Sequence, residues 1–253
     1  MAAALVLLFV HVGGEAGAVD DAALQGQFGV AHAQQAPDQI PFVTTWRTDA
    51  ANQTISIPLA GSDMTIHWGD GTSSTGVSGT ATHAYANPGT HTVSVYGGLE
   101  AISLGGHPDA AKLVSVDQWG DVSWTTMRSA FEGAANMVYA AADAPDLSRV
   151  TDMSQMFANA VSFNGDISGW DVSSVVDMNH MFWEATAFNG DISGWDVSSV
   201  TDMWHMFEYA TSFNQPLDSW NVSSVTNMHG MFWGATSFNQ PLDGWDVSSV
   251  TGM

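Results

Sequence analysis

Hydrophobic residues recur every 25 positions through the C-terminal part of the chain. One unit reads MFxxAxxFNxxIxxWDVSSVTDMxx, and four successive copies begin at Met156. A repeat of this length cannot bury its apolar face alone, so successive units are expected to stack into a solenoid. A degenerate copy around Phe131 precedes them with one extra residue. The pattern predicts a solenoid over 112–253, with degenerate first units at 112–150 and regular units at 151–253.

Each regular unit has local signals for a strand, a turn and one short helix. Apolar alternation broken by Gly and Asp predicts a strand near Phe163 to Ile167 and an extended piece at Trp170 to Val172. Ser174-Val-Val-Asp177 fits a capping box at a helix start. The helical face would carry Val175, Met178, Met181 and Phe182. The expected architecture of this part is therefore an α/β solenoid similar to leucine-rich repeats.

Three columns of residues recur at structural positions of the repeat. The phenylalanines are expected in the core, and the asparagines in a hydrogen-bonded ladder between turns. The tryptophans could line the core, together with the valines two residues on, or form an aromatic strip for stacking sugar rings. The columns are Phe163, Phe188, Phe213 and Phe238; Asn164, Asn189, Asn214 and Asn239; and Trp170, Trp195, Trp220 and Trp245.

The region over 38–104 has a different pattern, with short apolar alternations separated by Gly, Asn, Asp and Pro. Strands are expected at Thr54 to Ile57, Met64 to Trp68 and Thr90 to Tyr96. Asp70-Gly71 and Pro88-Gly89 are turn signals. Strands at this spacing predict a small β-sandwich as a separate domain before the solenoid.

The first 37 residues are expected to be a signal-like leader and a disordered linker. Ala2 to Val12 is similar to the apolar core of a secretion signal, and Ala16-Gly-Ala18 offers a small-residue cleavage site. A basic residue is missing before Arg47, which departs from that pattern. The apolar stretch is too short to span a bilayer, so direct membrane insertion is not expected.

Charge and composition exclude several function classes. The 253 residues include 26 acidic and 4 basic residues, a formal net charge of −22, and no Cys. Such a chain lacks the cations that nucleic acid and anionic lipid require, and it cannot form disulfides or Cys-ligated metal sites. All four basic residues precede position 151, whereas residues 151–253 carry 12 acidic ones.

The acidic residues form columns with two interpretations. Asp171, Asp196 and Asp246 occupy one repeat position, while Asp177 and Asp202 belong to another. Oxygen ligands suit Ca²⁺, so calcium could bridge the columns. Alternatively the first column holds turns and the second caps helix starts, a role that Asn221 and Asn227 would serve equally well. The second interpretation is favoured, and no other cofactor is expected.

Three further tryptophans, Trp183, Trp204 and Trp233, lie where the units differ from one another. Exposed aromatic residues are common anchors of binding surfaces, although packing on the solenoid surface would also explain them. His180 and His205 are one period apart, which fits either a metal pair or a solvent-facing position. Motifs of hydrolases, metalloproteases and nucleotide-binding enzymes are absent, so the chain is not expected to be an enzyme.

The unit, and the block WDVSSVTDM at Trp195 to Met203, resembles the repeat of BspA-like leucine-rich-repeat surface proteins, which also occurs in bacterial surface lipoproteins. The segments WGDGT, THAY and PGTHTVSV between Trp68 and Val95 are similar to PKD-like immunoglobulin-type modules. These resemblances imply an extracellular or cell-surface bacterial protein that mediates adhesion. The departure is that Met, Phe and Trp replace most of the leucines.

The function expected from these observations is non-covalent binding of an extracellular protein or glycan through a solenoid face. Two alternatives remain open: an accessory region of a larger secreted glycan-active enzyme, and a purely structural envelope spacer. The last unit stops at Met253 without a polar cap. The chain is therefore expected to be a monomeric, truncated fragment of a longer repeat array.

Overall fold

A computed structural model describes residues 39–253 of the chain. These residues belong to one compact unit spanning Gln35–Met253. The leader and linker expected over 1–37 lie outside the described residues.

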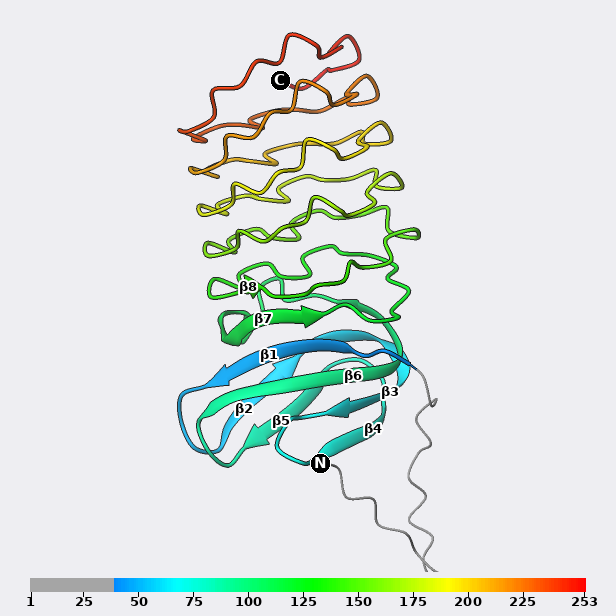
Figure 1. Ribbon diagram of the computed structural model, residues 1–253, viewed down its shortest axis with the longest axis vertical. Helices are drawn as coiled ribbons and strands as arrows, with labels where there is room; N and C mark the ends of the chain where they lie inside the picture. The colour runs from blue at the N-terminus through cyan, green and yellow to red at the C-terminus, as the bar shows by residue number, and fades with distance from the viewer. Residues whose placement is uncertain (1–38) are drawn as a thin grey trace, which may run out of the picture. The chain divides into compact units, whose positions relative to one another are not determined.

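The first part of this unit consists of two β-sheets (Figure 1). The larger has six strands in the order β4-β3-β6-β1-β7-β8, and the smaller pairs β2 with β5. Neighbouring strands are antiparallel except β7 and β8, which are parallel. The elements are β1 (Phe42–Thr48), β2 (Gln53–Ile57), β3 (Leu59–His67), β4 (Ser73–Val77), β5 (Ala81–Tyr85), β6 (Gly89–Ile102), the 3-10 helix η1 (Ala110–Lys112), β7 (Leu113–Gln118) and β8 (Val138–Tyr139).

The strands expected at 54–57, 64–68 and 90–96 are confirmed as parts of β2, β3 and β6, with Trp68 just after β3. Along β1, buried residues alternate with half-buried or exposed ones, and Phe42 and Trp46 are among the buried residues. The WGDGT segment forms a tight loop, in which the Thr72 amide and hydroxyl both donate to Oδ1 of Asp70, at 3.0 and 2.6 Å. This loop is an Asx turn, as the Asp-Gly pair predicts.

The sheet continues directly into the repeat region. Strand β7 follows η1 and pairs antiparallel with β1, placing Thr44 opposite Val116 and Trp46 opposite Leu113. Strand β8 then pairs in parallel with β7. The buried side chains of the sheets and of the repeat units form one continuous hydrophobic cluster. The first rung of the repeat region is thus a strand of the same sheet that contains β1, β3 and β6.

The repeat units beyond β8 lie one on the next as rungs, coloured green to red in Figure 1. The prediction of strands and a helix in each unit is wrong. These residues form turns and single bridges, and the described residues contain no α-helix. The bridges are parallel and join equivalent residues of successive units: Asp152 to Asp177, Asp177 to Asp202, Asp202 to Asn227 and Asn227 to Gly252.

The backbone conformation explains why a helical periodicity does not form a helix. Gln155 and Asn159 have left-handed φ angles of 58°, and the same two positions are left-handed in each later unit. Two left-handed residues four positions apart are incompatible with a continuous α-helix. Alternate N–H groups then point to the next rung: Gln155 donates to Asn179 and Phe157 to Met181, both at 2.9 Å. The apolar residues do recur at this spacing, but they face the core from turns and from the irregular segments between turns rather than from a helix.

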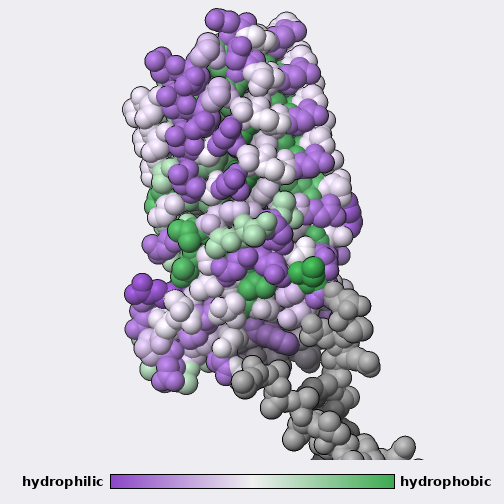
Figure 2. Space-filling view, in the orientation of Figure 1, coloured by the Kyte–Doolittle hydropathy of each residue, from purple (hydrophilic) through white to green (hydrophobic). Residues whose placement is uncertain are grey.

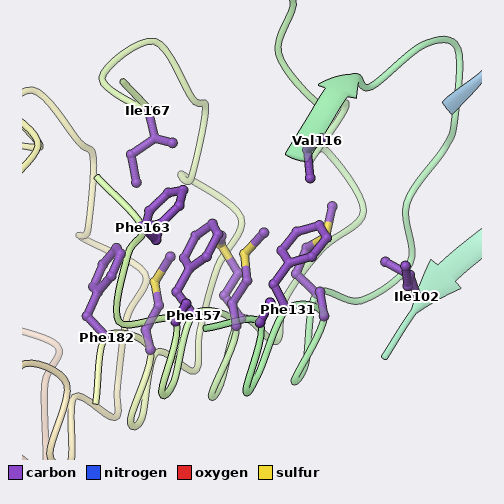
Figure 3. Packing of buried hydrophobic residues seen from close by; sticks show 14 of the residues in the cluster. Ile102, Val116, Phe131, Phe157, Phe163, Ile167 and Phe182 are labelled. Carbon is purple, nitrogen blue, oxygen red and sulfur yellow. The ribbon is translucent and has the colours of Figure 1, made fainter. Parts of the chain in front are cut away.

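The interior of the repeat region is a column of stacked aromatic rings. Phe131, Phe157 and Phe182 lie in a row, with methionine sulfur atoms near them (Figure 3). The centroids of Phe157 and Phe182 are 5.6 Å apart and their planes 11° from parallel. Within one rung, Phe157 also stacks on Phe163 at 3.9 Å. Burying such large apolar surfaces is the main stabilising contribution to the stack.

Candidate functional site

The four tryptophans of the regular column face inward rather than forming a strip on the surface. Trp170, Trp195 and Trp220 are buried, and Trp245 is half-buried. The indole N–H of Trp195 donates to the carbonyl of Ile167 at 3.1 Å, and that of Trp220 donates to Ile192 at 3.1 Å. Each of these tryptophans therefore ties its rung to the preceding one, and offers little surface to a ligand.

The asparagine column forms a ladder along the stack. The backbone N–H of Asn189 donates to Oδ1 of Asn164 at 2.8 Å, and Asn214 and Asn239 repeat the bond one rung on, at 2.9 and 2.8 Å. Phe163, Phe188 and Phe213 are buried beside it, and Phe238 is half-buried. These columns therefore hold the rungs together.

The aspartates of the repeat hold turns. The amide and hydroxyl of Ser173 donate to Oδ1 of Asp171, and Ser198 makes the same two bonds to Asp196. Asp246 receives the Ser248 amide. Asp177 does not cap a helix as expected. Its Oδ1 instead accepts from the amide of Asn179, two residues on, at 2.9 Å, and Asp202 accepts in the same way from Trp204.

Calcium bridging of these columns stays a prediction. Over residues 39–253 no group of three or more His, Asp or Glu side chains is arranged to hold a metal ion. In the same part of the chain no helix is long and apolar enough to cross a bilayer.

The turn aspartates are expected to make the stability of the folded chain depend on pH. Hydrogen bonds from Ser173 hold the pKa of Asp171 below its usual value, although the like charge of Asp196 acts to raise it. Hydrogen bonds from Ser198 lower the pKa of Asp196 in the same way. A lowered pKa in the folded state contributes stability above the unfolded pKa of about 4, and this is lost as pH falls through the folded pKa. We expect the melting temperature to fall progressively below about pH 4 in a thermal titration followed by circular dichroism.

A double variant that removes both hydroxyl donors, Ser173→Ala with Ser198→Ala, should have a shallower decline over the same pH range. A melting temperature that rises between pH 5 and pH 3 would contradict the prediction, because relief of repulsion among the carboxylates would then dominate.

Variation among the units is confined largely to one corner of the rung. In the four units starting at Met153, eleven of the 25 positions are identical, and only five carry three or more residue types. Four of the five lie in the turn segment that contains both left-handed residues, and the fifth directly precedes it. We call these four columns the variable corner: Ser154, Asn179, Trp204 and His229; Gln155, His180, His205 and Gly230; Ala158, Trp183, Glu208 and Trp233; Asn159, Glu184, Tyr209 and Gly234.

The variable corner carries the exposed aromatic side chains of the regular units. Trp204 is 41% exposed, Tyr209 42% and Trp233 60%, whereas Trp183 is half-buried. Figure 2 shows hydrophilic residues over much of one face of the repeat region, with hydrophobic residues visible between them. Two of the three tryptophans singled out in the sequence are thus exposed on one corner of the stack.

Histidines support these aromatic residues. The rings of His180 and His205 stack with centroids 5.2 Å apart, and Trp204 meets both edge-on, at 4.7 and 5.0 Å. His205 is buried, and its Nδ1 lies 2.5 Å from Oε2 of Glu208 without hydrogen-bond alignment. Burial and the neighbouring His205 lower the pKa of His180. The imidazoles therefore fix the position of the Trp204 ring.

Two glycines make room for this packing in the last unit. A Cβ on Gly230 would lie 2.6 Å from the His205 ring, and one on Gly234 would meet the ring of Tyr209. Both glycines are left-handed, as are His205 and Tyr209 one rung earlier. A non-glycine residue is disfavoured in this conformation, so the corner keeps large side chains at positions where the backbone favours glycine.

Sequence reasoning singled out the exposed tryptophans but missed Glu208 and Tyr209 as their neighbours. The signal was available in the comparison of units, because both residues occupy columns with three or more residue types in four copies.

A hollow of about 500 Å³ at the last rung is a separate feature. Phe232, Leu242 and Trp245 line it. In earlier units, the equivalent residues are covered by the following rung. The hollow is therefore the open face of the hydrophobic core rather than a built binding site.

The part of the chain that forms the stacked rungs matches a known protein family. A family model described as "Mycoplasma protein of unknown function, DUF285" matches residues 125–222 and 169–253. The chain belongs to the DUF285 family. The DUF285 matches include the degenerate unit and all four regular units, whereas strands β1 to β7 precede them. Searches of curated proteins and of solved structures gave no match.

Proposed function

We propose that this DUF285 protein is a secreted or cell-surface repeat protein that binds an extracellular protein or glycan without catalysis, through the variable corner. The observation that carries the proposal is the contrast between constant and variable positions. Identical positions hold the core and the ladders, whereas the varied ones gather on one corner with exposed Trp204, Tyr209 and Trp233. Exposed aromatic residues at positions that differ between copies are typical of recognition sites.

The resemblance to BspA-like repeats and to a PKD-like module supports an adhesive role. In the sheet region, the loop residues that resemble a PKD-like motif serve the fold. Asp70 holds its own loop and lies 2.7 Å from the His83 ring, which stacks on Trp68. The hydroxyl of Tyr85 donates to the Trp68 carbonyl at 2.8 Å. These side chains make their contacts within the sheet region, as expected of a module that supports the repeat region.

The proposal is tested by an array of glycans and extracellular matrix proteins probed with the whole chain at physiological salt. The double variant Trp204→Ala with Trp233→Ala should weaken a retained ligand by about tenfold or more, because anchor residues of this type carry much of the binding free energy. The control is Asp171→Asn with Asp196→Asn, in a column where Asn221 already occurs.

The control variant should retain the ligand. If no ligand is retained, or if the double variant binds as well as the unchanged chain, the proposal fails. Circular dichroism melts of all variants separate loss of binding from loss of folding.

A further inference from the structure

We infer that the variable corner binds a basic, extended segment of a partner protein, through arginine or lysine side chains placed on its tryptophans. This inference rests on the proposed function and narrows its ligand class. Trp204 and Trp233 are exposed, and their positions are one rung apart in the stack. Trp is the aromatic side chain that attracts cations most strongly.

Carboxylates lie in the same columns as the aromatic rings. Glu208 occupies the column of Trp183 and Trp233, so its rung lies between theirs. The backbone N–H of Glu184 donates to the carbonyl of Glu208 at 2.8 Å, and the N–H of Tyr209 donates to that of Trp233 at 2.7 Å. Glu208 is mostly buried against His205, and Glu184 is half-buried, so both contribute negative charge to the corner beside its exposed aromatic side chains. This arrangement fits cationic groups spaced along an extended chain.

The charge of the repeat region distinguishes among ligand classes. Residues 151–253 carry 12 acidic residues and no Lys or Arg. An anionic glycan would be repelled along the whole stack, and a neutral one would gain hydrogen bonds to the carboxylates but no charge attraction. A basic segment gains from both the aromatic faces and the charge. Charge complementarity therefore favours a basic protein partner over either class of glycan.

The experiment measures binding of the whole chain to a short peptide of alternating arginine and serine. Its control peptide carries citrulline, which has the same shape as arginine but no charge. We expect binding of the arginine peptide and at least tenfold weaker binding of the citrulline peptide. The variant Trp204→Ala with Trp233→Ala should weaken arginine-peptide binding by about fivefold to tenfold, since each cation–π contact is worth a few-fold in affinity.

A matched pair of charge variants separates the corner from the overall charge. Glu184→Gln removes one negative charge at the corner and leaves the buried contact of Glu208 with His205 in place, and Asp171→Asn removes one from another column. The first should weaken peptide binding more than the second. Equal effects of the two variants, or unchanged binding after loss of both tryptophans, would overturn the inference.

The array under Proposed function distinguishes the two levels of failure. If the tryptophan variant loses an array glycan while arginine and citrulline peptides bind equally, the binding corner stands and the basic ligand is refuted. If the tryptophan variant changes neither binding to the array nor binding to the peptide, both proposals fail. Melting curves of every variant establish that the chain remains folded.

Discussion

Replacing Trp195 by Ala should lower the free energy of unfolding by about 3–5 kcal/mol, the usual cost of truncating a buried aromatic side chain. Trp195 is 4% exposed, and its indole N–H bonds to the Ile167 carbonyl of the preceding rung. The variant leaves a cavity inside the stack and an unpaired carbonyl beside it. Urea unfolding followed by circular dichroism measures the loss.

Trp233→Ala is the matched control because Trp233 is 60% exposed. Its free energy of unfolding should change by less than about 0.5 kcal/mol, as is usual for surface substitutions. A change at Trp195 as small as that at Trp233 would show that the regular tryptophan column is not part of the core, and would revive the aromatic strip as a ligand surface.

The period of the repeat was enough to predict the stack and most of its ladders. Residues recurring every 25 positions must lie above one another, so the asparagine ladder and the row of phenylalanines follow directly. The same comparison of copies locates the variable corner. These features depend on translation along the stack, which the sequence contains explicitly.

The conformation within a rung could not be predicted in the same way. Val175, Met178 and Phe182 have helical spacing, yet the first two flank a single bridge at Asp177 and Phe182 lies in the turn that contains the left-handed His180. Glycine marks that position only in the last unit, at Gly230, because neighbouring rungs impose the conformation through hydrogen bonds between units. The local pattern favours a helix, but hydrogen bonds to residues about 25 positions away impose the conformation of a rung.

The pairing of β1 with β7 was equally hidden, because it joins residues about 70 positions apart. The change in composition at the start of the repeat region indicated a boundary between two modules. The structure shows that the sheet and the first rung share strands across that boundary, so composition records where repetition begins rather than where the core ends.

This sharing leads to the second large effect: replacing Trp46 by Ala should destabilise both parts of the described chain together. Trp46 is buried on β1, opposite His91 of β6 and Leu113 of β7. Loss of its side chain should lower the free energy of unfolding by about 3–5 kcal/mol. Because β7 is the strand on which the rungs begin, and each rung depends on its neighbour, the loss should also reach the repeat units.

Hydrogen exchange measured by mass spectrometry tests that coupling. In the Trp46→Ala chain, amides of the regular units, such as that of Phe182 bonded to Met206, should exchange faster together with the amides of β6. The control is Arg47→Ala, since Arg47 is exposed on the same strand and pairs with exposed Asp49, a contact worth little. Faster exchange confined to β1 and β6, with the regular units unchanged, would show that the rungs are stable without the sheet. In that case the stack would hold its variable corner in place through contacts between rungs alone.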